Sequence, residues 1–112
     1  MHLKLRMNHA HIEQLLRNHI DRRLRFALGR FGDRVGNVAV TLSGPEGRAG
    51  ESRCRIRIEI VPRGTFAVEE RGHDLLATID RAAGRVGRLF GREVGRVRDM
   101  RMTRDSIRLQ AA

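Results

Sequence analysis

The chain has 112 residues and a formal net charge of +10 at pH 7, so we expect one small domain and a polyanionic or acidic partner. All 23 of its basic residues are arginines except Lys4, and arginine suits bidentate contact with phosphate. The absence of Trp and Tyr argues against base stacking as the main binding mode. No apolar run could span a membrane, the N-terminus lacks a signal-peptide core, and a lone cysteine fits a reducing compartment. The sequence therefore predicts a cytoplasmic protein without a membrane partner.

The N-terminal third predicts a strand followed by a helix. Residues 3–7 alternate apolar and polar side chains, as in a half-buried strand. Between residues 11 and 31 the period becomes helical, and Gly29 and Gly32 weaken and end the helix. The apolar stripe of this helix consists of Ile12, Leu15, Leu16, Ile20, Leu24, Ala27 and Phe31.

Three further strands follow in the middle of the chain. They are expected over residues 37–43, 53–61 and 65–71, separated by a polar loop at 43–51 and a tight turn at 61–64. The middle strand has the clearest alternation, with Cys54, Ile56, Ile58 and Ile60 on one face and Arg53, Arg55, Arg57 and Glu59 on the other. Cys54 is therefore expected in the core, where it is chemically inert.

The last helix is expected over residues 74–96, with Asp74 as its N-cap. Its apolar arc consists of Leu75, Leu76, Ile79, Ala82, Ala83, Val86, Leu89, Phe90 and Val94. A ridge of arginines runs along one flank of this arc, at Arg81, Arg85, Arg88, Arg92 and Arg96. Like charges four residues apart repel each other, so such a ridge needs either solvent or a polyanion beside it.

Beside the ridge, glycines recur at positions 84, 87, 91 and 95. Each costs a helix roughly 1 kcal/mol relative to alanine. They either form a smooth strip on which a large partner approaches the backbone, or occupy tolerant exposed positions.

The order of elements, β-α-β-β-β-α, predicts an α+β fold for residues 1–96: a four-stranded sheet with two helices packed side by side on one face. Residues 97–112 are expected to be a basic tail, partly ordered at most, with weak extended pieces around residues 100–102 and 107–109. The outer surfaces of the two helices would carry a basic patch. Its members are Arg22, Arg25, Arg81, Arg85, Arg88 and Arg92.

Catalytic and metal sites are not indicated by any motif. His9 and His11 could form a metal pair, but no second cluster has the spacing of metal ligands. The loop at 44–48 lacks the Lys-Ser/Thr of a phosphate-binding loop. His19 reads as a partly buried packing residue and Asp80 as a solvated first-turn charge. We therefore expect no enzymatic activity, cofactor, metal or small-molecule substrate.

Two segments and the arginine ridge carry a resemblance to a known family. The segments are LLRNHIDRRLRFAL at 15–28 and PRGTFAVEERGHDLLATIDRAA at 62–83. They resemble the ribosome hibernation-promoting factors, also called ribosomal subunit interface proteins, over about residues 3–96. The family's basic positions fall on Arg85, Arg88 and Arg92 of the last helix and on Arg23 of the first. Departures at Glu13, Phe26, Leu76 and the glycine row indicate a divergent branch.

The resemblance implies that residues 1–96 bind rRNA of the small ribosomal subunit, in the channel for tRNA and mRNA. Translation in idle or stressed cells would then be blocked by steric occlusion through arginine–phosphate contacts. Two other hypotheses remain. The α-β-β-β-α portion is similar to a double-stranded-RNA-binding domain, which reads duplex shape. The ridge could instead dock an acidic protein.

Overall fold

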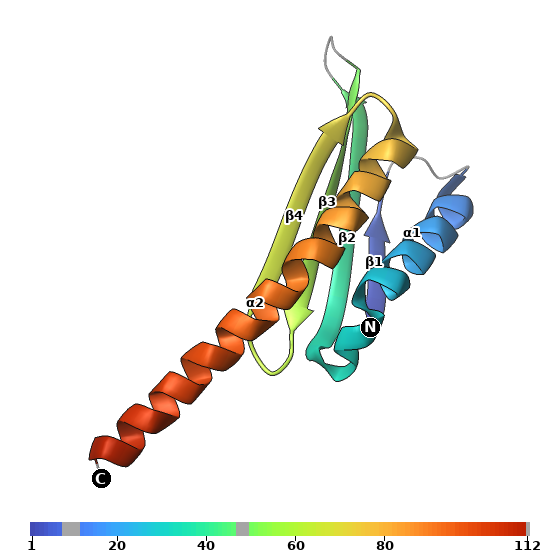
Figure 1. Ribbon diagram of the computed structural model, residues 1–112. Helices are drawn as coiled ribbons and strands as arrows, with labels where there is room; N and C mark the ends of the chain where they lie inside the picture. The colour runs from blue at the N-terminus through green and yellow to red at the C-terminus, as the bar shows by residue number, and fades with distance from the viewer. Residues whose placement is uncertain (8–11, 47–49, 112) are drawn as a thin grey trace.

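The structure, a computed structural model, describes residues 1–7, 12–46 and 50–111. For residues 45, 46 and 97–111 it describes the backbone alone. The elements are β1 (His2–Arg6), α1 (Glu13–Leu28), the 3-10 helix η2 (Gly29–Arg34), β2 (Val35–Glu46), β3 (Glu51–Ile60), β4 (Thr65–Gly72) and α2 (Leu75–Ala111). Figure 1 shows their arrangement. The predicted α+β fold with the order β-α-β-β-β-α is confirmed.

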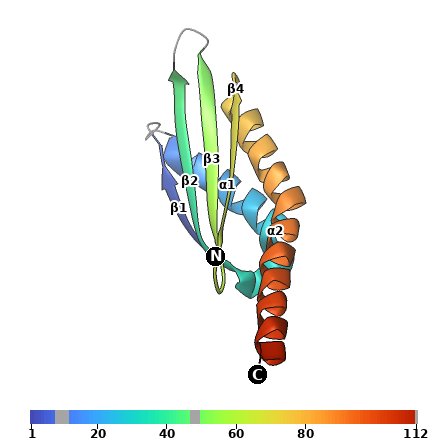
Figure 2. The ribbon, with the colours of Figure 1, turned by 90° about the vertical axis from the view of Figure 1, so that its left-hand side faces the viewer.

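The four strands form one sheet in the order β1-β2-β3-β4. β1 runs parallel to β2, while β3 is antiparallel to both of its neighbours. A parallel pair needs a long crossover, and α1 supplies it between β1 and β2. Both helices lie on the same face of the sheet, and the other face is open to solvent (Figure 2).

The strict alternation in β3 decides which face of the sheet becomes the core. Cys54, Ile56, Ile58 and Ile60 are at most 1% exposed, whereas the residues between them are exposed. Successive side chains of a strand point to opposite faces, so a period of two places every isoleucine under the helices. The predicted orientation of this strand is confirmed.

Phe90 of α2 sits at the centre of the core and is fully buried. Its ring makes edge-to-face contacts with Phe31, at 5.0 Å between centroids, and with Phe66, at 5.6 Å. These contacts join α2 to η2 and to β4, so Phe90 helps to fix how the long helix lies on the domain. The second contact also places the half-buried Phe66 against the core.

Two leucines predicted for the apolar stripes are exposed to solvent. Leu15 of α1 is 72% exposed and Leu76 of α2 is 51% exposed. Both stand in the first turns of their helices. In α1 the buried side chains are Leu16, Ile20, Leu24 and Leu28, a narrower stripe than the sequence pattern predicted.

Both helices differ in length from the prediction. α1 ends at Leu28 and gives way to η2, within which Gly32 adopts a positive φ of 40°. α2 continues without a break to Ala111, so the extended pieces expected after residue 97 are wrong. No Pro or Gly follows Gly95, and the arginines, methionines and leucine there favour helix, which allows an established helix to propagate. Figure 1 shows this end of α2 projecting beyond the sheet.

Burial of Cys54 predicts an unreactive thiol. Burial raises its pKa from 9.0 to about 12, and the negative charge of Glu70 adds to the effect. Because the thiolate is the nucleophile, its fraction at neutral pH falls by about a thousandfold. Iodoacetamide should therefore label the native protein far more slowly than the protein in urea. Equal labelling rates with and without urea would contradict this prediction.

The free energy of unfolding should also fall as pH rises above 9.0, because the thiol of Cys54 in the unfolded chain releases its proton at a lower pH than in the folded protein.

Candidate nucleic-acid interface

The start of α2 fixes the rotation of the helix and hence the direction of its arginines. The backbone amide of Ala77 donates to Asp74 Oδ1 at 3.1 Å, which confirms Asp74 as the N-cap. The hydroxyl of Thr78, which is fully buried, donates to the backbone oxygen of Asp74 at 2.7 Å. The first turn of α2 is thus stabilised by hydrogen bonds to both the side chain and the backbone of Asp74.

The arginine ridge lies on the flank of α2 that faces β4. Arg81 Nη2 donates to the backbone oxygen of Arg71 at 2.7 Å. One turn later, Arg85 Nη1 donates to the backbone oxygen of Glu69 at 3.2 Å and lies 3.5 Å from Glu70 Oε1. These two arginines attach α2 to the edge strand, so part of their hydrogen-bonding capacity is used within the domain.

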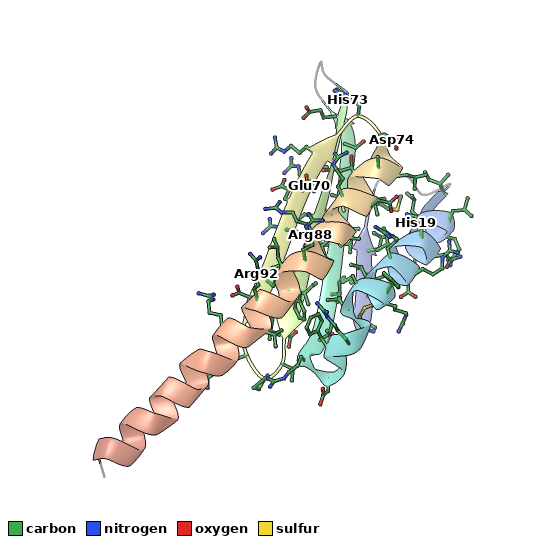
Figure 3. The ribbon with its side chains drawn as sticks, in the orientation of Figure 1. His19, Glu70, His73, Asp74, Arg88 and Arg92 are labelled. Atoms are coloured by element: carbon green, nitrogen blue, oxygen red, sulfur yellow. The ribbon has the colours of Figure 1, made fainter. Side chains whose placement is uncertain are left out.

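Arg88 and Arg92 extend the same flank by two further turns, as Figure 3 shows. Both side chains are exposed. Within the described part of the chain neither forms a hydrogen bond or an ion pair, in contrast to Arg81 and Arg85. Each guanidinium group can therefore donate hydrogen bonds to two anionic oxygens without giving up a hydrogen bond or ion pair that holds the fold.

The arginine of α1 that the family resemblance singled out, Arg23, points between the helices. Its Nη2 donates to the backbone oxygen of Asp80 at 3.3 Å, and its Nε lies 3.3 Å from Asp80 Oδ1. That carboxylate oxygen already has a partner in His19 Nε2, at 2.8 Å. His19, Arg23 and Asp80 form a cross-helix cluster that the sequence-based interpretation of each residue missed. Their shared position at the margin of the two apolar arcs was the available signal.

The remaining arginines of the predicted patch lie on α1 itself. Arg25 Nε donates to Asp21 Oδ2 at 2.8 Å, one turn earlier on the same helix. Arg22 is exposed. In Figure 1, α1 and β4 lie on opposite sides of α2. The seven predicted residues therefore divide into a β4-side ridge (Arg81, Arg85, Arg88 and Arg92) and a separate set on α1 (Arg22, Arg23 and Arg25).

The glycines of α2 have a role that neither interpretation of the sequence anticipated. A Cβ at Gly87 would lie 3.6 Å from Ala27 Cβ, and a Cβ at Gly91 would lie 3.1 Å from the ring of Phe31. These two glycines bring α2 close to α1 and η2. A Cβ at Gly95 would meet no atom within 4 Å, so only this end of the row is open.

Substitution of the open glycine should stabilise the protein. Gly95→Ala should raise the free energy of unfolding by about 1 kcal/mol, because alanine loses less backbone entropy in a helix. Gly91→Ala should gain less, since its methyl group would press on the Phe31 ring. Urea denaturation of both variants measures the difference. A loss of stability in Gly95→Ala would show that the position is not open.

Other kinds of site find little support in the described residues. Among them, no three His, Cys, Asp or Glu side chains gather to hold a metal ion, while His9 and His11 lie outside the described residues. No described helix is both long and apolar enough to cross a membrane.

Comparison with known proteins gives a family and a fold. The model of the family described as Sigma 54 modulation protein / S30EA ribosomal protein matches residues 3–98. No curated protein matches the chain.

Two solved structures are similar. The N-terminal domain of Protein Y from Thermus thermophilus shares 30% identity, with 82% of this chain and 98% of that chain covered and a TM-score of 0.67. A ribosomal subunit interface protein from Coxiella burnetii shares 14% identity, with 83% and 97% covered and a TM-score of 0.66, which supports the fold. The resemblance that the two sequence segments suggested is confirmed. The chain therefore belongs to the Sigma 54 modulation protein / S30EA ribosomal protein family.

Proposed function

We propose that this protein is a cytoplasmic, ribosome-associated factor that binds rRNA of the small subunit and blocks translation by occupying its site. The observation that carries the proposal is the pair Arg88 and Arg92. These two exposed guanidinium groups stand on successive turns of a helix that Asp74, Arg81 and Arg85 hold in place. In a chain with a net charge of +10 that belongs to a ribosomal protein family, phosphate is the ligand that such a pair suits best.

The mechanism requires binding and no chemical step. A fixed helix presents its arginines without first ordering a loop, so less conformational entropy is lost on binding. The bound domain then excludes other ligands from the same part of the subunit. The expected behaviour is stoichiometric inhibition without turnover.

Sedimentation and translation together test the proposal. The protein should co-sediment with small subunits in a sucrose gradient, and inhibition of a cell-free translation reaction should saturate near one protein per ribosome. A plain RNA duplex in excess should fail to displace it. Release by the duplex would favour a general double-stranded-RNA-binding module. Co-sedimentation that survives nuclease digestion of the rRNA would favour an acidic protein partner.

A further inference from the structure

The open face of the sheet carries a second group of basic side chains, which the prediction of the helix patch left out. β1 presents Lys4 and Arg6 on this face, and β3 presents Arg55 and Arg57. The strand register aligns Lys4 with Arg57 and Arg6 with Arg55, in each case across one residue of β2. Two basic walls thus face each other across the middle strand.

The floor between these walls is made of small side chains. Ala39 is the residue of β2 between Lys4 and Arg57, and Thr41 is the residue between Arg6 and Arg55. A depression of about 320 Å³ lies over them, and its lining is completed by Lys4, Arg6, Val40, Arg55 and Arg57. Two strand spacings separate the walls by about 10 Å. We call this depression the sheet groove.

The positive charge of the sheet groove is uncompensated within the described residues. None of its four cationic side chains has a hydrogen bond or ion pair there. Glu69, which is aligned with Arg55 in the register, lies 3.3 Å from Arg53 Nε and 3.8 Å from Arg71 Nη2 instead. The carboxylate of Glu69 is thus shared by two arginines that lie outside the groove. Four neighbouring cations without a counter-charge repel one another, and an anion between them would relieve the repulsion.

We propose that the sheet groove binds one phosphodiester backbone of RNA. The floor of Ala39 and Thr41 offers no aromatic ring on which a base could stack, so the groove suits the backbone and not the bases. Alternate residues of a strand are about 6.7 Å apart, comparable to the spacing of successive phosphates in an extended RNA strand. Each wall can therefore contact two neighbouring phosphates, with bidentate arginines on the β3 side.

This assignment rests on the proposed function only in taking RNA as the partner, and it adds a second contact surface. The β4-side ridge belongs to α2, and the helices cover one face of the sheet (Figure 2). The exposed side chains that line the sheet groove lie on the opposite face. One RNA surface cannot contact both. The domain would then be held between two RNA segments, which explains how a small protein could occupy a channel stably.

A pair of double variants tests the groove with a matched control. Arg55→Gln with Arg57→Gln removes two charges from the groove. Arg53→Gln with Arg71→Gln removes two charges from the same face outside it. Binding to polyuridylate, which is single-stranded, should fall at least about tenfold in the groove variant and less than about twofold in the control. The slope of log K against log salt should also become shallower by about 1.4, for two lost phosphate contacts on a single strand.

A binding measurement with inorganic tripolyphosphate tests whether the groove binds RNA or a small phosphate anion. If the groove selects RNA, tripolyphosphate should show no saturable binding to the wild-type protein. Saturable binding that the groove variant alone loses, with polyuridylate binding unchanged, would overturn the assignment in favour of a small anion. Equal losses of polyuridylate binding in the groove and control variants would overturn it too, since only net charge would then matter.

The fold and the proposed function are checked separately. Melting curves show whether each variant folds, and Lys4→Gln with Arg6→Gln repeats the test from the opposite wall if the first variant unfolds. Failure of the wild-type protein to co-sediment with small subunits would reject the proposed function. The polyuridylate result decides the groove independently of that outcome. Loss of ribosome binding in Arg88→Glu, with unchanged ribosome and polyuridylate binding in both groove variants, would overturn the groove alone.

Discussion

Arg88→Glu and Arg92→Glu should each weaken binding to the small ribosomal subunit by at least about tenfold. A charge-assisted contact with phosphate contributes about 1.5–3 kcal/mol, and glutamate adds repulsion in the same place. Both side chains are exposed and form no hydrogen bond or ion pair within the described residues, so the loss would not come from a broken polar interaction inside the domain. Co-sedimentation at graded protein concentrations gives the affinity of each variant.

The thermal stability of Arg88→Glu should stay the same or rise, although its binding to the ribosome weakens. In Arg88→Glu the new carboxylate would stand three residues after Arg85 and four before Arg92, which replaces two repulsive pairs by attractive ones worth about 0.2–0.5 kcal/mol each. Thermal unfolding should therefore occur at an equal or higher temperature. Arg17→Glu, on α1, is the control with the same change in charge. If Arg17→Glu weakens binding as much as Arg88→Glu does, binding depends on the net charge of the protein and not on the position of the ridge.

Salt should weaken ribosome binding steeply. If six or more phosphates are engaged, affinity should fall by about a thousandfold or more between about 50 and 200 mM salt, because bound phosphates release their counterions. The basis is the net charge of +10 together with the exposed arginines on the helical layer and the open sheet face. A filter-binding titration measures the slope.

The slope also distinguishes between contact types. In Arg88→Glu it should become shallower by about one contact, which a purely structural defect would not cause. A nearly flat salt dependence of the wild-type protein would mean that phosphate contacts do not dominate. An apolar or base-reading interface would then have to carry the affinity.

Local periodicity explains why much of the fold could be predicted from the sequence. The alternation around Ile56 and Ile58 and the cap at Asp74 depend on neighbours within one strand or one turn. The exposure of Leu15 could not be predicted in the same way. An apolar residue at helical spacing joins the core only if the sheet extends beneath its turn, and that depends on how the elements are placed.

The candidate site was predictable only in part for the same reason. Helical spacing aligned Arg88 and Arg92 on one flank, and the structure shows them there. The direction of Arg23 depends on the rotation of α1 against α2, which its contact with Asp80 reveals. The sheet groove is harder to predict from the sequence, because its residues come together only through the register of β1, β2 and β3. A strand sequence by itself does not specify its partners.

The parallel pairing of β1 bears on the order in which the domain assembles. His2 pairs with Asn37, so this contact closes a much longer loop than the turns that join β2, β3 and β4. Long loops cost more entropy to close, and contacts between distant residues form late in folding. β1 is also an edge strand of five residues, held by one neighbour. Its amides should therefore exchange with solvent deuterium before those of β3. The wall that carries Lys4 and Arg6 would accordingly be the last part of the sheet groove to form and the first to open.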